Sequence, residues 1–367
     1  MERSHSFDRR RVRLPLGFGD VSPLQAAGLV AVIALFAFFP LIDRNAGHIS
    51  AVADAGYFLL LVFGLNIVVG FAGLLDLGYA AFFAIGAYTY AMVASTQFNL
   101  HFNFWPMLFM SACVAALFGL ILGAPTLRLR GDYLAIVTLG FGEIVPQVFL
   151  NLDKYTGGPN GISNVDQPVF FGYHFGFNPI PYYYLYVVVI LIAIVLLNNL
   201  KRSRLGRAWM AIREDELAAT HMGVNPVTTK LLAFAMGASF AGLAGCIYAA
   251  KLTLISPDEF NFSVSVTILS AIVLGGMGSL LGAFIGGLLL ALLNFMVLPQ
   301  ITNWTHALGA ALHNDAIQNA DLHYIIYGLI LVLVMLFRPE GLISNASRRA
   351  ELHHAQPAES AAAAGTE

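Results

Sequence analysis

The run LQAAGLVAVIALFAFFPLI at residues 24–42 contains no charged side chain and is long enough to cross a bilayer as a helix. An α-helix rises about 1.5 Å per residue, so about 20 residues span the roughly 30 Å hydrocarbon core. Similar runs recur along the chain, which is 58% hydrophobic and 11% charged, with a mean hydropathy of +0.74. The alternation typical of barrel strands is absent. The sequence therefore predicts an all-α polytopic membrane protein and excludes an ordinary soluble domain.

Polar and Gly-rich breaks divide the chain into about ten predicted transmembrane or half-membrane helices. Two pairs of these helices are separated only by Gly-rich breaks, with no charged loop between their members. The predicted segments are 24–42, 51–73, 75–95, 106–127, 133–151, 181–199, 229–250, 262–277, 279–298 and 323–337.

The basic residues are distributed unevenly across this topology. When the N-terminus is placed in the cytoplasm, all of the 19 Lys and Arg residues except Arg44, Lys154 and Lys251 fall on the cytoplasmic side. Membrane proteins retain positive charge on that side, and an even number of spans places both termini there. The predicted parts are a basic cytoplasmic segment at 1–22, a transmembrane domain at 23–342 with an external loop at 152–181, and a disordered cytoplasmic tail at 343–367.

The sequence KRSRLGRAWMAIREDELAATHMGVNP at 201–226, between the sixth and seventh predicted spans, is polar enough to form a short soluble helix. Acidic residues at 214–216 suit a helix N-terminus, and Gly223 suits a left-handed C-terminal cap before Pro226. A rigid cytoplasmic helix of this kind suits docking onto a soluble motor. A connector lying on the lipid surface fits the same residues, so both interpretations stay open.

Few polar side chains lie within the predicted spans, where a charge costs about 2.5–3.5 kcal/mol at mid-bilayer. The acids are Asp54, Asp76 and Glu143, and Asn66 and Asn294 are amides in apolar surroundings. Of these, Glu143 is the strongest candidate for a group that faces a cavity, and structural hydrogen bonding is the alternative.

Glycines at four-residue spacing indicate close helix packing, and Gly278, Gly282 and Gly286 form such a ladder. The sequence GGMGSLL at 275–281 is similar to GFAGLL at 70–75, which suggests a duplicated unit. Both copies run in the same direction in the predicted topology, so they do not support an inverted repeat.

Motifs of common catalytic and nucleotide-binding sites are absent. There is no GxxxxGK[ST] loop to hold a phosphate, and no HExxH or GxSxG motif. Cys113 and Cys246 lie in apolar spans, and His306, His313 and His323, on the predicted external loop 299–323, match no standard metal spacing. We therefore predict no enzyme activity, cofactor, metal or nucleic-acid binding.

Several motifs in chain order resemble one family. ELAATHMG at 216–223 resembles the coupling loop of ATP-binding-cassette importer permeases. Further segments resemble the branched-chain amino-acid permeases, specifically the longer of that importer's two membrane subunits. These segments are GLLDLGY at 73–79 with GAY at 86–88, LRLRGDY at 127–133, AIVTLGFGEI at 135–144, TGGPNGI at 156–162 and RPEGL at 338–342. The resemblance spans about residues 50–342, and a His-rich insert at 303–321 and the Ala-rich tail depart from it.

This resemblance implies a bacterial cytoplasmic (inner) membrane subunit of an importer that works by alternating access. The implied partners are a second related permease, two cytoplasmic ATPases and a periplasmic binding protein. The residues expected to couple to the ATPase are Arg213, Glu214, Glu216, Ala218, Ala219 and Gly223. The candidate pathway residues are Asn66, Gly73, Asp76, Glu143 and Gly278.

The resemblance implies leucine, isoleucine and valine as substrates, and a chain with few polar anchors suits the passage of an aliphatic zwitterion. Two alternatives stay open. One is an importer permease for another small solute, such as urea, a short amide or another amino acid. The other is an ion-coupled secondary transporter with Glu143 or Asp54 as the proton carrier, which would leave the segment at 201–226 unexplained.

Overall fold

The structure is a computed structural model that describes residues 45–311 apart from 99, 127–131 and 171, together with 39–41, 43, 328, 329, 332, 336 and 342. The predicted spans 24–42 and 323–337 lie largely outside these residues, as do the basic segment 1–22, the tail 343–367 and much of the His-containing loop.

Every predicted span that falls on the described residues is helical. Seven of the helices are long and apolar enough to cross a membrane, and α3 is a shorter apolar helix. Among the described residues, these helices are α2 (Ala46–Leu65) with a π-helical extension (Asn66–Phe71), α3 (Tyr79–Val93), α4 (Phe104–Thr126), α5 (Asp132–Asn151), α7 (Pro179–Arg202), α10 (Pro226–Leu252), α11 (Phe262–Gly275) with the 3-10 turn before it, and α12 (Leu280–Leu292). Helix α12 continues through a second π-helical segment (Leu293–Val297) into α13 (Leu298–Ala311), and the three together count as one span.

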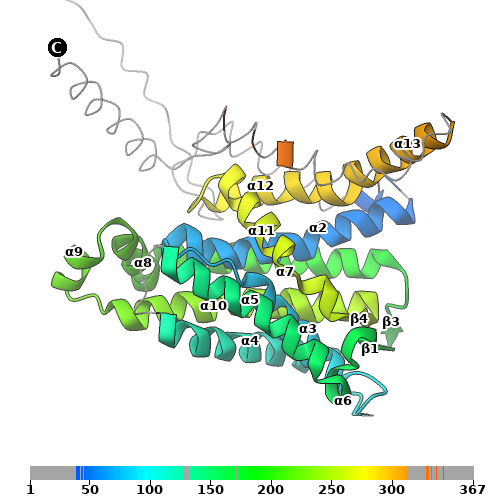
Figure 1. Cartoon of the computed structure of the whole chain (residues 1–367), viewed down its shortest axis with the longest axis horizontal. Coiled ribbons are helices and arrows are strands. Elements are labelled where there is room, and N and C mark those ends of the chain that lie inside the picture. The colour runs from blue at the N-terminus through cyan, green and yellow to red at the C-terminus, as the bar shows by residue number, and fades with distance from the viewer. Residues whose placement is uncertain are drawn as a thin grey trace, which may run out of the picture.

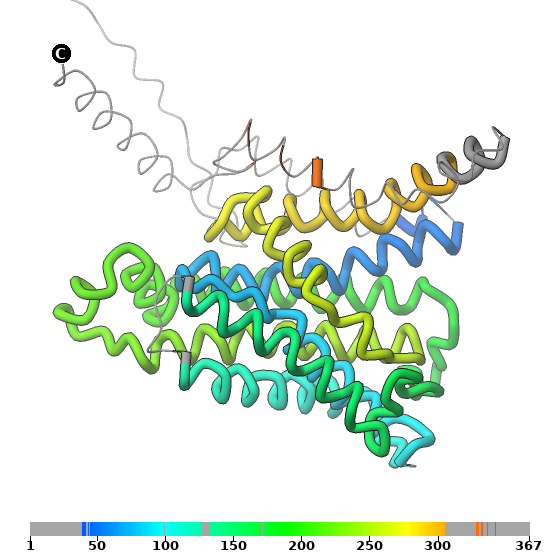
Figure 2. The backbone as a smooth tube through the Cα atoms, in the orientation of Figure 1, coloured from blue at the N-terminus to red at the C-terminus, as the bar shows by residue number. Residues whose placement is uncertain are grey.

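Helix α2 forms the centre of the bundle. With its π-helical extension it is largely apolar apart from side chains such as Asp54 and Asn66, and 89% of its most apolar stretch is buried inside the protein. A helix without a polar face is expected in the core of a helical membrane protein. It packs against α7, α10, α11 and α12, while α10 also packs along α3 and α4 (Figures 1 and 2).

Glycines allow close helix contacts at several crossings. A Cβ at Gly86 would collide with the backbone of Gly242, where α3 crosses α10. A Cβ at Gly282 would likewise collide with the Gly275 carbonyl, where α12 folds back onto α11. The glycine ladder predicted from the sequence thus packs helices within this chain.

The two ends of the bundle carry different elements (Figure 1). Helices α8 (Arg204–Glu214) and α9 (Glu216–His221) lie at one end. At the other end lie α6 (Asp153–Thr156), two 3-10 turns (Gly158–Asn160 and Pro257–Phe260) and four short strands: β1 (Ile162–Ser163), β2 (Val169–Phe170), β3 (Tyr173–His174) and β4 (Leu254–Ile255).

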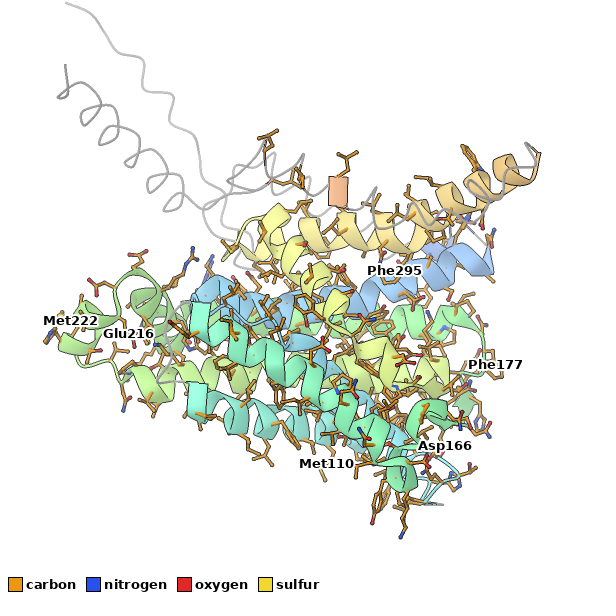
Figure 3. The ribbon with its side chains drawn as sticks, in the orientation of Figure 1. Met110, Asp166, Phe177, Glu216, Met222 and Phe295 are labelled. Atoms are coloured by element: carbon orange, nitrogen blue, oxygen red, sulfur yellow. The ribbon has the colours of Figure 1, made fainter. Side chains whose placement is uncertain are left out.

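The segment predicted as an external loop is folded onto that second end. Strand β1 pairs antiparallel with β4, with Ile162 opposite Ile255, and β2 pairs with β3. His101 Nδ1 lies 2.7 Å from Asp166 Oδ2, within hydrogen-bonding distance. Figure 3 shows Met222 at one end of the bundle and Asp166 and Phe177 at the other. Segments 201–226 and 152–181 therefore lie at opposite ends, as the predicted topology requires.

Candidate functional site

The segment at 201–226 contains two capped helices rather than one. The Ser203 side chain caps α8 by accepting a hydrogen bond from the Gly206 N–H. Asp215 then separates the helices, and its Oδ1 accepts from the N–H groups of Leu217 and Ala218 at the start of α9. Such caps satisfy backbone donors that a helix leaves without partners at its N-terminus.

The predicted Gly223 cap is confirmed. Gly223 has a φ of +87°, its N–H donates to the Thr220 carbonyl, and the Val224 N–H donates to the Ala219 carbonyl. This pair of bonds is a Schellman motif, which ends α9 sharply. Pro226 is the first residue of α10 and follows an Asn225 cap, so it begins the next span immediately.

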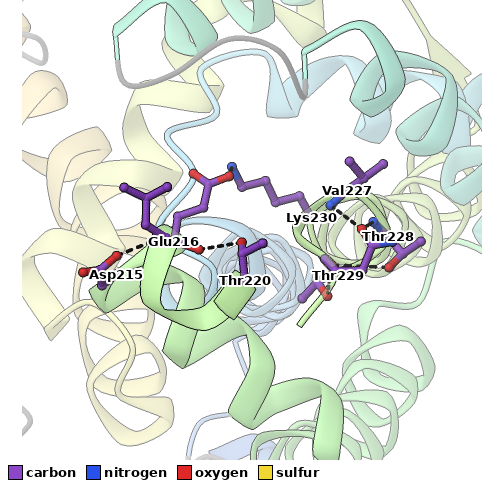
Figure 4. A network of polar contacts seen from close by, with 9 residues as sticks. Asp215, Glu216, Thr220, Val227, Thr228, Thr229 and Lys230 are labelled. Carbon is purple, nitrogen blue, oxygen red and sulfur yellow. Dashed lines mark hydrogen bonds and ion pairs between the residues drawn. The ribbon is translucent and has the colours of Figure 1, made fainter. Parts of the chain in front are cut away.

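Two side-chain contacts fix this segment to the start of α10. The buried Trp209 indole donates to the Thr229 carbonyl at 2.7 Å. The Lys230 ammonium lies 2.7 Å from Glu216 Oε1, with Lys230 buried and Glu216 about one-third exposed (Figure 4). The segment is thus a rigid extension of the bundle rather than a loose connector.

The side of α9 that points away from the bundle is exposed and partly apolar. Leu217 is 64% exposed and Met222 is 86% exposed, while Ala219 is buried against the protein. Glu214 and Ala218 are also exposed. We call Leu217, Ala218 and Met222 the α9 face. A compact apolar patch with a charged rim is typical of a docking surface for another protein.

Arg213, at the C-terminal end of α8, points into the bundle instead. Its Nη1 donates to the Gly70 carbonyl at 2.6 Å, where the π-helical extension of α2 ends. Its side chain also lies against Gly73 and Gly278: a Cβ added at Gly278 would lie 2.7 Å from Nη1. Gly73 and Gly278 have φ values of +70° and +77°, so both breaks use the left-handed conformation that favours glycine.

The break at 276–279, between α11 and α12, contacts the π-helical extension that leads into the break at residues 72–78, before α3, and Arg213 lies against both breaks. Asn66 Oδ1 accepts from the Gly278 N–H at 3.1 Å. Asp76 Oδ1 accepts from the Gly78 N–H at 2.9 Å. Asn66 Nδ2 and Asp76 Oδ2 are buried without a hydrogen-bond partner among the described residues. Such unpaired buried groups are costly, which is typical of a functional region that changes its contacts.

Helix α5 is joined to the first break. The Leu77 N–H donates to Thr138 Oγ1 at 3.0 Å. Gly142 on α5 lies so close to Gly78 that a side chain at either glycine would collide with the backbone opposite it. Glu143, one residue further along α5, is exposed on the outer side of the helix. Ile136 and Ile144 share this side and are 63% and 60% exposed.

The structure therefore brings together most, but not all, of the predicted pathway residues. Asn66, Gly73 and Gly278 meet around Arg213, and Asp76 lies in the same break as Gly73. Glu143 lies apart from them on the exposed side of α5. No group of His, Cys, Asp or Glu among the described residues is arranged to hold a metal ion.

Comparison with known proteins identifies the family. A family model described as branched-chain amino acid transport system / permease component matches residues 48–335. The chain belongs to this permease family. The permease is 39% identical over 342 residues to the high-affinity branched-chain amino acid transport system permease protein LivM of Escherichia coli K12, covering 87% of this chain and 75% of that protein.

More distant relatives include permeases named for the same and for another solute. The permease is 29% identical to LivH, another branched-chain amino acid permease of E. coli K12, over 146 residues, or 40% of this chain and 42% of LivH. It is 23% identical to the autoinducer 2 import system permease LsrC of Yersinia enterocolitica, over 76% of this chain and 77% of LsrC. No solved structure matches. The family and the apolar helices make this permease a multi-pass protein of the cytoplasmic membrane.

Sequence reasoning missed three residues of this region. Lys230 is an isolated cation at the start of an apolar span, and that signal could have identified it as an ion-pair partner. Trp209 is a large aromatic residue in an otherwise polar helix, which favours an anchoring role. Thr138 gives no sequence signal, because its contact with Leu77 joins residues 61 positions apart.

Proposed function

We propose that this permease carries leucine, isoleucine and valine through the membrane as one subunit of an importer driven by separate ATPase subunits. The observation that carries the proposal is the rigid α8–α9 segment, which presents the exposed α9 face at one end of the bundle. The sequence has no phosphate-binding loop of its own, so ATP hydrolysis belongs to a partner.

The α5 side that carries Ile136, Glu143 and Ile144 is proposed to face a second, related permease. Only 28% of the most apolar stretch of α5 is buried in this chain, whereas 89% of the corresponding stretch of α2 is buried. A carboxylate such as Glu143 is costly against lipid, so a polar path between two subunits suits it better. The opposite end, with Phe177 86% exposed, is proposed to receive the substrate-binding protein.

The proposed mechanism is alternating access. Closure of the ATPase pair moves α8 and α9, and the rigid movement rearranges the Gly-packed helices around the two breaks so that the pathway opens outward. Helices that contact through glycine backbones slide without having to repack large side chains.

The test is ATP-driven uptake by the reconstituted complex. The permease is co-expressed with a related second permease and the ATPases, purified, and placed in proteoliposomes with binding protein outside and ATP inside. We expect stoichiometric co-purification and uptake of radiolabelled leucine that requires ATP and persists when the proton gradient is dissipated. Uptake by the permease alone, or uptake that follows the proton gradient, would contradict the proposal.

A second candidate substrate class is another small solute. The similarity to LsrC over 76% of the chain supports it, because that relative is named for autoinducer 2 import. Competition of leucine uptake by unlabelled leucine, isoleucine, valine, urea and short amides separates the candidates. Failure of excess isoleucine and valine to compete would favour a different solute.

The ion-coupled alternative receives less support. Asp54 lies 2.6 Å from the Lys251 ammonium, which also donates to the Ser50 carbonyl. This ion pair joins α2 to the end of α10, which gives Asp54 a structural role that does not require it to carry a proton.

A further inference from the structure

Arg213 occupies the junction between the coupling segment and both helix breaks. It belongs to α8, yet its side chain is partly buried and donates to the Gly70 carbonyl, 143 positions earlier in the chain. The same guanidinium lies against Gly73 and Gly278. The end of α8 thus meets the ends of two interrupted helices at this one side chain.

We infer that Arg213 is a positioning residue that transmits movement of the α8–α9 segment to helix α5 through the break at 72–78. The inference rests on the proposed function, because it assumes that an ATPase moves that segment. It differs from the initial expectation that the Arg213 side chain contacts the ATPase directly.

The first link runs from Arg213 to the start of the break. A guanidinium presents five donors in a fixed planar arrangement, so it holds a carbonyl in a defined direction. The Gly70 carbonyl belongs to a π-helical turn, a rare conformation that often occurs at functional sites. Gly73 follows in the left-handed region, so the chain turns immediately after the point where Arg213 binds it.

The second link runs from the end of the break to α5. Leu77 donates to Thr138 on α5, and the Gly78 backbone packs directly against Gly142. The contact leaves no space for a side chain, so α5 must follow displacement of residues 77–78. Glu143 directly follows Gly142 in α5. The side of α5 that is proposed to face the pathway therefore lies at the end of this series of contacts.

The break itself is suited to adopt two arrangements. Asp76 Oδ2 and Asn66 Nδ2 are buried and have no hydrogen-bond partner among the described residues, although each side chain holds the chain through its other polar atom. A rearrangement that gives either atom a partner would recover part of the cost of its burial. Asp76 lies between Gly73 and Leu77 in this series of contacts, and Asn66 holds Gly278 of the second break beside Arg213.

The test compares Arg213→Ala with Arg207→Ala in the reconstituted complex. Arg207 lies on the same helix, but it is exposed and its Nη1 donates to the Arg202 carbonyl within the segment. We expect Arg213→Ala to keep its ATPase subunits but to lose stimulation of hydrolysis by loaded binding protein, and to take up leucine at least about tenfold more slowly. Arg207→Ala should match the unmodified complex.

A thiol reporter separates transmission from a general loss of folding. Leu75→Cys places a half-buried thiol inside the break, in a chain whose Cys113 and Cys246 are replaced by alanine. Its rate of modification by a water-soluble maleimide should change when the complex is trapped with vanadate. With Arg213→Ala the rates with and without trapping should be equal, and Arg213→Lys should restore part of the difference because lysine can still donate to Gly70.

The possible results are distinct. If Arg213→Ala retains both uptake and the trapping-dependent modification rate, Arg213 does not transmit the movement. If the variant loses its ATPase subunits, Arg213 supports docking or folding instead, and the inference is equally overturned. Failure of the unmodified complex to drive uptake with ATP would instead contradict the proposed function.

Discussion

Glu216 and Lys230 form the contact that holds α9 against the start of α10. Their charged atoms lie 2.7 Å apart, with the Lys230 side chain only 8% exposed. An exposed ion pair stabilises a protein little, but removing one partner of a largely buried pair leaves a charge without compensation. The position of α9 therefore depends on this pair more than on the helix itself, which has six residues and little intrinsic stability.

Glu216→Lys should abolish transport-coupled ATP hydrolysis, because two ammonium groups would then repel each other at this contact. We expect a destabilisation of about 1–3 kcal/mol, measured as a lower thermal unfolding midpoint of the purified complex, while the permease stays inserted. The double exchange Glu216→Lys with Lys230→Glu restores an ion pair in the opposite sense. Recovery of uptake in the double variant is expected, and its continued absence would mean that Glu216 binds the ATPase directly.

Individual residues show what could and could not be predicted from the sequence. Gly223 was predictable because a left-handed cap is a local requirement that glycine meets at low cost. The separation of the segment at Asp215 was not predicted, because neighbouring acids suit the first turn of one helix as well as the cap of a second. Arg213 was expected at the ATPase surface, since no local pattern indicates that its side chain reaches Gly70.

Helix α9 carries the surface on which the proposed function depends. Leu217 and Met222 would not be expected to remain exposed on an isolated soluble segment, because burying an apolar side chain of this size gains about 1.5–3 kcal/mol. Their exposure at the end of the bundle therefore favours a protein partner over a connector surrounded by water.

Met222→Asp should reduce co-purification of the ATPase subunits, because it places a charge in the centre of the α9 face. Phe177→Asp is the matched control, since Phe177 is also 86% exposed but lies at the opposite end of the bundle. The ratio of ATPase to permease in the purified complex measures the effect. Equal loss of ATPase from both variants would show a general disturbance of assembly and would count against docking at α9.

The two Gly-rich breaks were located correctly by the sequence, but the contact of the second break with the π-helical extension was not. A glycine-containing interruption of an apolar run is a local signal, and the chain does turn at 72–78 and 276–279. The hydrogen bond from Gly278 to Asn66 joins residues 212 positions apart. Such pairing depends on how α2, α11 and α12 pack, which periodicity cannot determine.

Some helices of the bundle are enclosed by the rest of the chain and others are not, and this difference favours an assembly with other subunits. Helix α2 is almost entirely enclosed, whereas α5 leaves most of its apolar surface exposed along with Glu143. Lipid can cover isoleucines but is a poor environment for a carboxylate. The exposed side of α5 therefore suits the proposed second subunit, which would complete a polar path at Glu143.

The predicted topology places segments 201–226 and 152–181 on opposite sides of the membrane, with the former in the cytoplasm. In chains whose native cysteines are replaced by alanine, Phe177→Cys should react with a membrane-impermeant maleimide on intact cells, because the external loop faces the periplasmic side. Met222→Cys should react only after the membrane is permeabilised and the ATPase subunits are removed. The two positions have the same exposed fraction, so a difference in labelling reports sidedness rather than burial. Labelling of Met222→Cys from outside would reverse the orientation, and an inward-facing motor could then no longer act on α9.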